Sequence, residues 1–279
     1  MARNGGWTLE GEHTPAIQLS LLRGFELRVA QRPVALVSSA QRLVAFLALR
    51  DKPLTRAHVA GTLWPDTTMS RANANLRSSL WRAQRMCRQL ITASARHLEL
   101  TPGVGVDVRS AIAYAQRLLG HTATLDDVAH WSDLAADLLP DWYDDWALLD
   151  RERYHHLRLH ALEALCQRLT VAGRYGEAID TGLAAIRAEP LRESAHQALI
   201  KAHLAEGNRL EAFRQYERCR RLLLDELGLE PSPALHALLP LPEWTPAVPP
   251  RPDELATWAG ATRKTPRQLA LTRTPRRSG

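Results

Sequence analysis

A repeat with a period of 34 residues in the second half of the chain is the feature that most limits its fold. Four residues of one unit recur in the next: Leu165, Gly173, Glu177 and Ala178 have counterparts at Leu199, Gly207, Glu211 and Ala212. Pro190 breaks the pattern, because Leu224 occupies the matching position. A unit of this length cannot bury its apolar face alone, so it stacks on its neighbours, and small residues let helix axes approach closely. The repeat therefore predicts stacked helix pairs.

Helical segments on both sides are expected to close this tetratricopeptide-like stack. An atypical unit around residues 111–139 would cover one end, and the long helix 210–227, ended by Gly228 and Pro231, would cover the other. From Pro240 onward prolines, threonines and arginines alternate without a hydrophobic period. This composition predicts a disordered tail, even though Trp244 and Trp258 lie in it.

The first hundred residues have a different pattern. Residues 17–29 form two apolar runs broken at Arg23 and Gly24, which predicts a hairpin. Three helices with capping hydroxyls follow: residues 39–50 from Ser39, 55–64 from Thr55 (stopped by Pro65), and 70–87 from Ser70. A second hairpin, LITAS and HLELT with a turn near Ala95 and Arg96, is closed by TPGVG. Strands, three helices and a hairpin are the order of a winged helix-turn-helix.

Charge separates the same two parts of the chain. Residues 16–110 carry 14 basic and 5 acidic side chains, a net charge of +9, whereas residues 111–240 carry 14 and 20, a net charge of −6. A basic domain joined to an acidic one indicates a polyanion partner for the first and a different partner for the second. By charge alone, two ordinary solvated surfaces explain the asymmetry equally well.

The third expected helix combines an apolar stripe with a polar face. Its stripe has helical spacing: Ala72, Leu76, Leu80, Ala83 and Cys87. At about 100° per residue, the opposite face collects polar side chains: Arg71, Asn75, Ser78, Arg82 and Arg85. Ala74 lies between them, with Arg77 and Trp81 on the flank. A helix in the major groove needs donors for guanine and adenine edges, and short residues where its backbone approaches the bases.

Positions along this face predict two kinds of DNA contact, one to base edges and one to phosphates. We expect Arg71, Asn75 and Ser78, near the helix start, to contact base edges, and Arg82 and Arg85 mainly to contact phosphates. Arg77 would contact phosphate or form an intramolecular ion pair. Outside this helix we expect three further contacts: Arg56 with phosphate, and Arg96 and His97 with a neighbouring minor groove.

Other interpretations compete with DNA binding. Of the 36 basic residues 33 are arginine, so a surface helix of this composition would look similar without reading DNA. An adaptor that holds a partner peptide in the repeat groove is a second alternative. A metal site is a third, because His156 and His160 lie at i and i+4 beside His155. No glutamate stands next to the first histidine as zinc hydrolases require, so we expect satisfied histidines and neither a metal nor a catalytic site.

Several classes of protein are not indicated. Cys87, Cys166 and Cys219 are far apart and form no C-x-x-C pair, so we expect small core residues rather than disulfides or zinc ligands. No uncharged apolar run approaches the roughly 18–20 residues of a membrane span, and the first residues lack a secretory apolar core, so a cytosolic protein is expected. No G-x-x-x-x-G-K-[ST] occurs, and no cofactor is expected.

Four segments make the chain similar to the SARP family of bacterial transcriptional activators in its small form. They are ALRDKPLTRAHVAGTLWPD (48–66), NLRSSLWRAQR (75–85), LLPDWYDDWALLDRERY (138–154), and AEPLRESAHQALIKAHLAEGNRLEAFRQYERCRRLLLDELGLEPSP (188–233). The resemblance extends over about residues 17–238. It implies an output-type winged helix followed by a bacterial transcriptional activator domain of tetratricopeptide-like repeats.

The resemblance also implies function. Members of the family bind tandem direct repeats in promoter DNA as protomers side by side, contact RNA polymerase and its sigma factor, and control secondary-metabolite gene clusters. The family's Leu-Arg pair falls on Leu76 and Arg77, which implies a DNA contact for Arg77. The family's second Leu-Arg pair is replaced by Ala83, Gln84 and Arg85, and its Gly-Tyr-x-Leu wing by HLELTPGVGV.

The predicted fold is mainly α with small β-hairpins: a winged helix-turn-helix followed by an all-α tetratricopeptide-like repeat domain. Its boundaries are expected as follows: an N-terminal extension at 1–15, the winged helix at 16–108, the activator domain at 109–239 and a disordered basic tail at 240–279. The predicted function is sequence-specific DNA binding and transcriptional activation without enzymatic activity.

Overall fold

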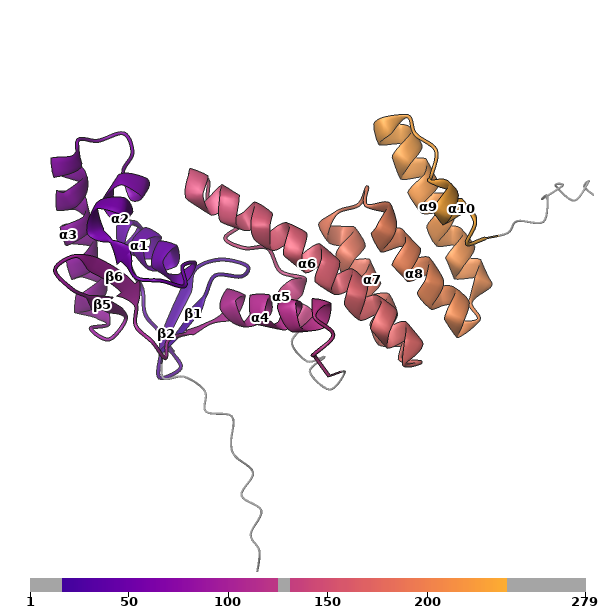
Figure 1. Cartoon of the computed structure of the whole chain (residues 1–279), viewed down its shortest axis with the longest axis horizontal. Coiled ribbons are helices and arrows are strands. Elements are labelled where there is room, and N and C mark those ends of the chain that lie inside the picture. The colour runs from indigo at the N-terminus through magenta and orange to yellow at the C-terminus, as the bar shows by residue number, and fades with distance from the viewer. Residues whose placement is uncertain (1–16, 125–130, 240–279) are drawn as a thin grey trace, which may run out of the picture. The chain divides into compact units, whose positions relative to one another are not determined.

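The structure is a computed structural model that describes residues 17–124 and 131–239. Backbone contacts divide the chain into Met1–Leu238 and Leu239–Gly279, and only the first unit is described below. The expected N-terminal extension and the expected disordered tail, with Trp244 and Trp258, lie outside the described residues. The fold is mainly α with small hairpins, as predicted, and both hairpins precede helices α4 to α10 along the chain (Figure 1).

Two small sheets and three helices form the N-terminal part. Strands β1 (Ile17–Ser20) and β2 (Glu26–Val29) pair antiparallel around the predicted turn, where Arg23 has φ +67° and Gly24 has φ +145°. The second predicted hairpin consists of β5 (Ile91–Ala93) and β6 (His97–Leu100). Between them lie α1 (Ser38–Ala48), α2 (Arg56–Leu63) and α3 (Met69–Met86). Both hairpins and all three helices are therefore confirmed.

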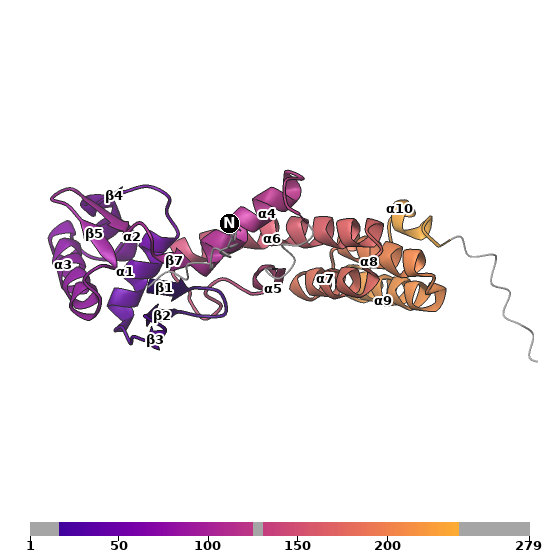
Figure 2. The same ribbon diagram turned by 90° about the horizontal axis from the view of Figure 1, so that it is seen from below.

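Three two-residue strands complete the sheets. β3 (Arg32–Pro33) and β7 (Gly105–Val106) extend the first sheet to the order β3-β2-β1-β7, and β4 (Leu54–Thr55) extends the second to β4-β6-β5. β7 is parallel to β1, which ties the end of the winged part to its first strand. In Figure 2, strands β4 and β5 of the second sheet lie on one side of α1, and strands β1, β2 and β3 of the first sheet lie on the other.

The helix starts correct two of the predicted caps. Thr55 caps α2 as expected, since its side chain accepts a hydrogen bond from the His58 N–H at 3.3 Å. The cap of α3 is Thr68, not Ser70, because the Thr68 hydroxyl accepts from the Arg71 N–H while Ser70 already lies inside the helix. α1 begins at Ser38 after Val37 and has no side-chain cap, so Ser39 does not cap it.

The regular secondary structure described after residue 106 is helical, apart from an isolated β-bridge between Leu138 and Leu22. The helices of this part are α4 (Asp107–Leu119), α5 (Trp131–Leu134), α6 (Asp145–Val171), α7 (Tyr175–Ala188), α8 (Glu193–Glu206), α9 (Arg209–Leu227) and α10 (Pro233–His236). Helices α6 to α9 lie side by side in chain order (Figure 1), and α4 packs against α6. The predicted repeat is visible in the backbone, because Gly173 and Gly207 both adopt left-handed conformations between paired helices.

The repeat also packs as its small residues predict. Ala178 and Ala212 are both fully buried. A Cβ added to Gly182 in α7 would lie 3.2 Å from the Leu199 Cβ, so the missing side chain lets α7 approach α8 closely. At the end of the stack α9 stops at Gly228, whose φ of +67° forms the expected glycine cap.

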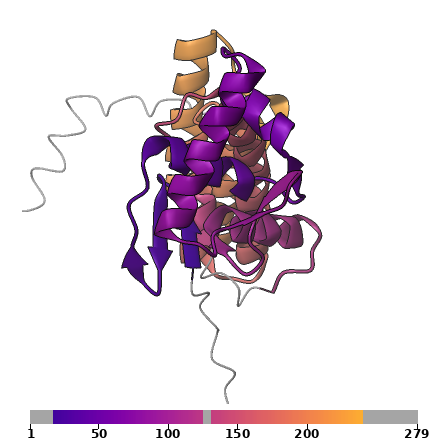
Figure 3. The same ribbon diagram turned by 90° about the vertical axis from the view of Figure 1, so that its left-hand side faces the viewer.

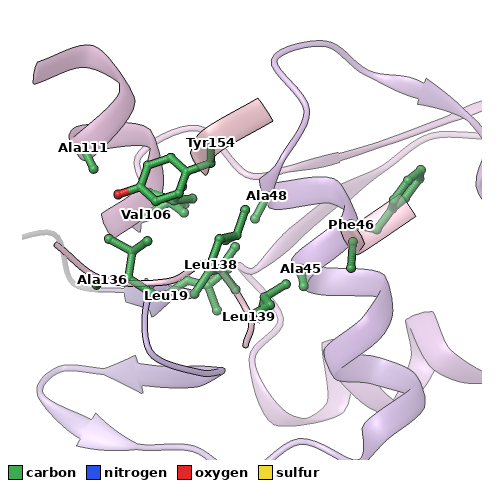
Figure 4. Packing of buried hydrophobic residues seen from close by; sticks show 14 of the residues in the cluster. Leu19, Ala45, Phe46, Ala48, Val106, Ala111, Ala136, Leu138, Leu139 and Tyr154 are labelled. Atoms are coloured by element: carbon green, nitrogen blue, oxygen red, sulfur yellow. The ribbon is translucent and has the colours of Figure 1, made fainter. Parts of the chain in front are cut away.

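One buried core runs from the winged part into the helical part. Figure 4 shows Leu19, Ala45, Phe46 and Ala48 from strand β1 and helix α1 beside Val106, Ala111, Ala136, Leu138, Leu139 and Tyr154. The Phe46 ring meets the Trp146 ring edge-on at 5.2 Å. The core is therefore continuous across the junction at residue 108.

Candidate nucleic-acid interface

Helices α2 and α3 form a helix-turn-helix. α2 ends at Leu63, and a short turn through Pro65 leads to the Thr68 cap of α3. The turn is fixed by the Thr67 hydroxyl, which donates to the Trp64 carbonyl at 3.2 Å. Figure 3 shows α3, in purple, in front of the other elements of the winged part.

The inward face of α3 is the predicted apolar stripe. All five of its residues are buried: Ala72, Leu76, Leu80, Ala83 and Cys87. Burial also raises the pKa of the Cys87 thiol, which favours an uncharged core residue. Ser79 is buried beside the stripe, so the two adjacent serines have different environments: Ser79 faces the core and Ser78 is exposed.

The outward face of α3 carries the side chains that were expected to contact DNA. Arg71, Arg77, Ser78, Arg82 and Arg85 are exposed, and Asn75 is half-buried. α3 contains four arginines and no acidic residue. Within residues 17–124 and 131–239 none of these arginines forms an ion pair, so their positive charge is not neutralised locally. This condition suits a phosphate backbone, and it disfavours the intramolecular ion pair considered for Arg77.

Two arginines of α3 are held by neighbouring side chains. The Arg82 guanidinium donates to the Ser39 hydroxyl of α1 at 3.3 Å. The Arg85 guanidinium carbon lies 5.2 Å from the centroid of the Trp81 ring, within cation–π range. Ser39 was a helix-cap candidate in the sequence, and its contact with Arg82 joins residues 43 positions apart. No periodic signal in the sequence could have indicated this contact.

The second hairpin carries Arg96 and His97 at its turn, and both side chains are exposed. The turn is closed by the Ser94 hydroxyl, which accepts hydrogen bonds from the N–H groups of Arg96 at 3.3 Å and His97 at 2.9 Å. Arg56 at the start of α2 connects this turn to the helix-turn-helix, since its Nε donates to the Ser94 carbonyl at 3.0 Å. Arg56 therefore positions the hairpin in addition to its expected phosphate contact.

Known proteins resemble this arrangement. Residues 124–239 match the bacterial transcriptional activator domain. Regulatory protein AfsR of Streptomyces coelicolor is 28% identical over 249 residues, which cover 85% of this chain and 25% of that protein. Regulatory protein AfsR of Streptomyces griseus is 27% identical over 208 residues, 70% of this chain and 21% of that protein. These matches make the chain similar to the SARP family of transcriptional regulators.

A solved structure shares the fold of this chain. EmbR of Mycobacterium tuberculosis, solved in complex with a low-affinity phosphopeptide, superposes with a TM-score of 0.61 at 20% identity, covering 80% of this chain and 64% of that one. The chain spans about a quarter of the length of the curated relatives it matches.

Ion pairs and hydrogen bonds join the winged part of the chain to its helical part. Arg42 of α1 pairs with Asp144 at the start of α6. Arg50 pairs with Asp150 at 2.7 Å. Arg109 of α4 donates to the Ala48 carbonyl at 2.7 Å and to the Arg50 carbonyl at 2.6 Å. The sequence does not reveal these contacts, because each joins residues about 60–100 positions apart.

The histidines considered as metal ligands have other partners. His156 lies 2.8 Å from the Glu152 carboxylate, His155 lies 3.5 Å from Glu189, and the His160 ring contacts the Arg192 guanidinium at 3.2 Å. Within residues 17–124 and 131–239, no group of three or more His, Cys, Asp and Glu side chains is placed to hold a metal ion.

The three cysteines are buried and unpaired, as predicted. Burial raises the pKa of Cys166 and that of Cys219 to about 11, so both thiols stay protonated. None of the helices in the described part combines the length and the apolar character that a bilayer crossing requires.

Proposed function

We propose that this chain is a sequence-specific DNA-binding activator of transcription that inserts α3 into the major groove. The observation that carries the proposal is the outward face of α3, where exposed arginines, Asn75 and Ser78 lie opposite a fully buried stripe. Arginine donates to guanine O6 and N7, and asparagine bridges adenine N6 and N7.

The proposed contacts follow position along the helix. Arg71, Asn75 and Ser78 read base edges, while Arg77, Arg82 and Arg85 bind phosphates and set the register. Ser39 supports the role of Arg82, because the hydrogen bond between them restricts the guanidinium. Arg56 holds the second hairpin, from which Arg96 and His97 contact the adjacent backbone or minor groove.

We further propose that two protomers bind side by side in the same orientation on direct repeats in a promoter. Such head-to-tail contacts match a direct repeat, whereas a two-fold dimer matches a palindrome. Bound protomers would recruit RNA polymerase with its sigma factor and activate a biosynthetic gene cluster. A protein that reads promoters acts where the chromosome lies, so we expect it in the cytoplasm, associated with the nucleoid.

Footprinting with the full chain on the upstream regions of neighbouring genes tests this proposal. We expect protection of two direct repeats, a specific Kd of about 10⁻⁸ to 10⁻¹¹ M at moderate salt, and a steep loss of affinity with salt, with a slope of about −0.9 per phosphate contact. No protection and a flat salt dependence would refute DNA reading and favour the adaptor that holds a protein partner.

Three substitutions separate the proposed roles. Asn75→Ala is expected to change which bases are tolerated, at about 1–3 kcal/mol per lost base contact. Arg82→Ala is expected to weaken binding to all sequences alike and to reduce the salt slope by about one contact. Arg32→Ala is the matched control, since Arg32 is exposed on β3, outside α3. Equal effects of all three variants would refute the assignment of α3.

A further inference from the structure

Trp81 is a large apolar side chain on the flank of the polar face of α3. The Trp81 side chain is 58% exposed, whereas Leu80, one position before it, and Ala83, two positions after it, are buried. Its neighbours on the helix surface, three and four positions away, are Arg77, Ser78, Gln84 and Arg85; Gln84 is half-buried and the other three are exposed. The indole therefore lies between a side chain proposed to read bases and one proposed to bind phosphate.

This position means that DNA on α3 covers the indole. Residues three and four apart on a helix are about 5–6 Å apart at their Cβ atoms, so a ligand that reaches both Ser78 and Arg85 also removes water from Trp81. The other exposed large apolar residues of α3 are Met69 at its start and Met86 at its end. Neither has Ser78 and Arg85 as neighbours within one turn on the same face.

Arg85 limits how the indole can be used. Its guanidinium carbon lies over the Trp81 ring at 5.2 Å, so the cation occupies one side of the ring and is held near the end of α3. The remaining ring surface is apolar. In the major groove only thymine presents an apolar group, its C5-methyl, to such a surface.

We propose that Trp81 is a specificity-determining residue that reads a thymine by packing its indole against the C5-methyl group. The proposal rests on the proposed DNA-binding function and adds to it a base preference made by an apolar contact. The proposal also accounts for the position of Arg85, because the ring that packs against the methyl group is the one that the Arg85 guanidinium contacts.

Single replacement of each thymine by deoxyuridine in the footprinted duplex tests the proposal, because it removes only the methyl group. The full wild-type chain is expected to bind at least one such duplex about fourfold more weakly, the effect of exposing one buried methyl group. Trp81→Ala is expected to bind the thymine and deoxyuridine duplexes equally, because the partner of the methyl group is gone. Because Trp81 is exposed, this variant should keep the wild-type circular dichroism spectrum.

Arg82→Ala is the matched control on the same face, because Arg82 is proposed to bind phosphate and its guanidinium is held by Ser39. It is expected to weaken binding to both duplexes by the same factor and to retain the wild-type ratio between thymine and deoxyuridine. A wild-type chain that binds its duplex but ignores every methyl group would overturn the proposal for Trp81 and leave the proposed function standing. Retention of the wild-type ratio by Trp81→Ala would overturn it as well, and a chain that protects no duplex would overturn both proposals.

Discussion

Asp107, at the first turn of α4, accepts hydrogen bonds from the backbone where β1 ends. Its Oδ1 accepts from the Leu21 N–H at 2.9 Å and from the Val108 N–H at 2.7 Å, and its Oδ2 accepts from the Leu22 N–H at 3.0 Å. Leu21 and Leu22 are both buried. One carboxylate thus satisfies backbone donors of the first sheet and of the first helix of the helical part.

Replacing Asp107 by alanine would leave the Leu21 and Leu22 N–H groups without this acceptor. A buried donor without a partner costs about 1–3 kcal/mol, so Asp107→Ala is expected to lower the free energy of unfolding by about 2–6 kcal/mol. Burial raises the pKa of Asp107 despite its three N–H donors, so desolvation already offsets part of the gain and the lower half of this range is expected. A loss anywhere in this range is a large fraction of the free energy of unfolding of an ordinary domain.

Urea unfolding followed by circular dichroism measures this loss. Asp107→Asn is expected to fall between the wild type and the alanine variant, because the amide retains one acceptor oxygen but turns an NH₂ group toward a backbone donor. Asp141→Ala serves as the control, since Asp141 is exposed in the segment before α6. If Asp107→Ala unfolds within about 0.5 kcal/mol of that control, the range of ordinary surface substitutions, the carboxylate does not join the two parts and the reasoning fails.

Three further outcomes are expected. His196 is fully buried, and burial lowers its pKa in the folded chain. Because the unfolded chain then binds more protons, the free energy of unfolding should fall as the pH drops below about 6.5. Urea titrations at several pH values should show a smaller fall for His196→Gln than for the wild type. Gly182→Val should destabilise the chain by about 1–3 kcal/mol, because the new side chain overpacks against α8. Gly176→Val, at a position with open space, should not destabilise it. Equal melting temperatures of the two variants would contradict the close packing of α7 and α8. A double-mutant cycle on Arg50 and Asp150, whose side chains are 25% and 11% exposed, should give a coupling energy of about 0.5–3 kcal/mol, and additive single effects would show that this ion pair does not couple the parts.

Periodicity predicted those elements whose burial is local. The spacing of Leu76, Leu80 and Ala83 identified the inward face of α3, and the 34-residue period identified the stacked helix pairs, although Gly173 and Gly207 lie between helices and not at a helix crossing. In both cases the signal lies within a few helical turns of the chain. One face of a helix packed on a core must be apolar at 3.6-residue intervals, so the sequence carries the pattern directly.

The missed features depend on partners far away in the chain. The strands β4 and β7 have two residues each, too few to show alternation, and they exist because β6 and β1 supply their hydrogen bonds. The cap of α3 was misplaced by two residues, since Thr68 and Ser70 offer the same hydroxyl chemistry and only the backbone after Pro65 decides between them. Local patterns do not distinguish such alternatives.

The candidate interface divides in the same way. Which residues of α3 face outward followed from helical geometry, and the structure has them exposed or half-buried. The contacts that hold Arg82 and Arg56 could not be predicted, because Ser39 and the Ser94 carbonyl reach them through the tertiary fold. The chemistry of the surface could thus be deduced from the sequence, but the orientation of its arginines could not.

The continuous core around Phe46, Leu138 and Tyr154 bears on how proteins of this kind are exchanged and engineered. A cut near residue 108 would expose one side of α1 and remove the acidic partners of Arg42 and Arg50. A chimera that joins the winged part of one relative to the helical part of another would combine two halves of the hydrophobic core that do not match. On the proposed function, DNA preference is therefore easier to change at the outer surface of α3 than by exchanging whole modules.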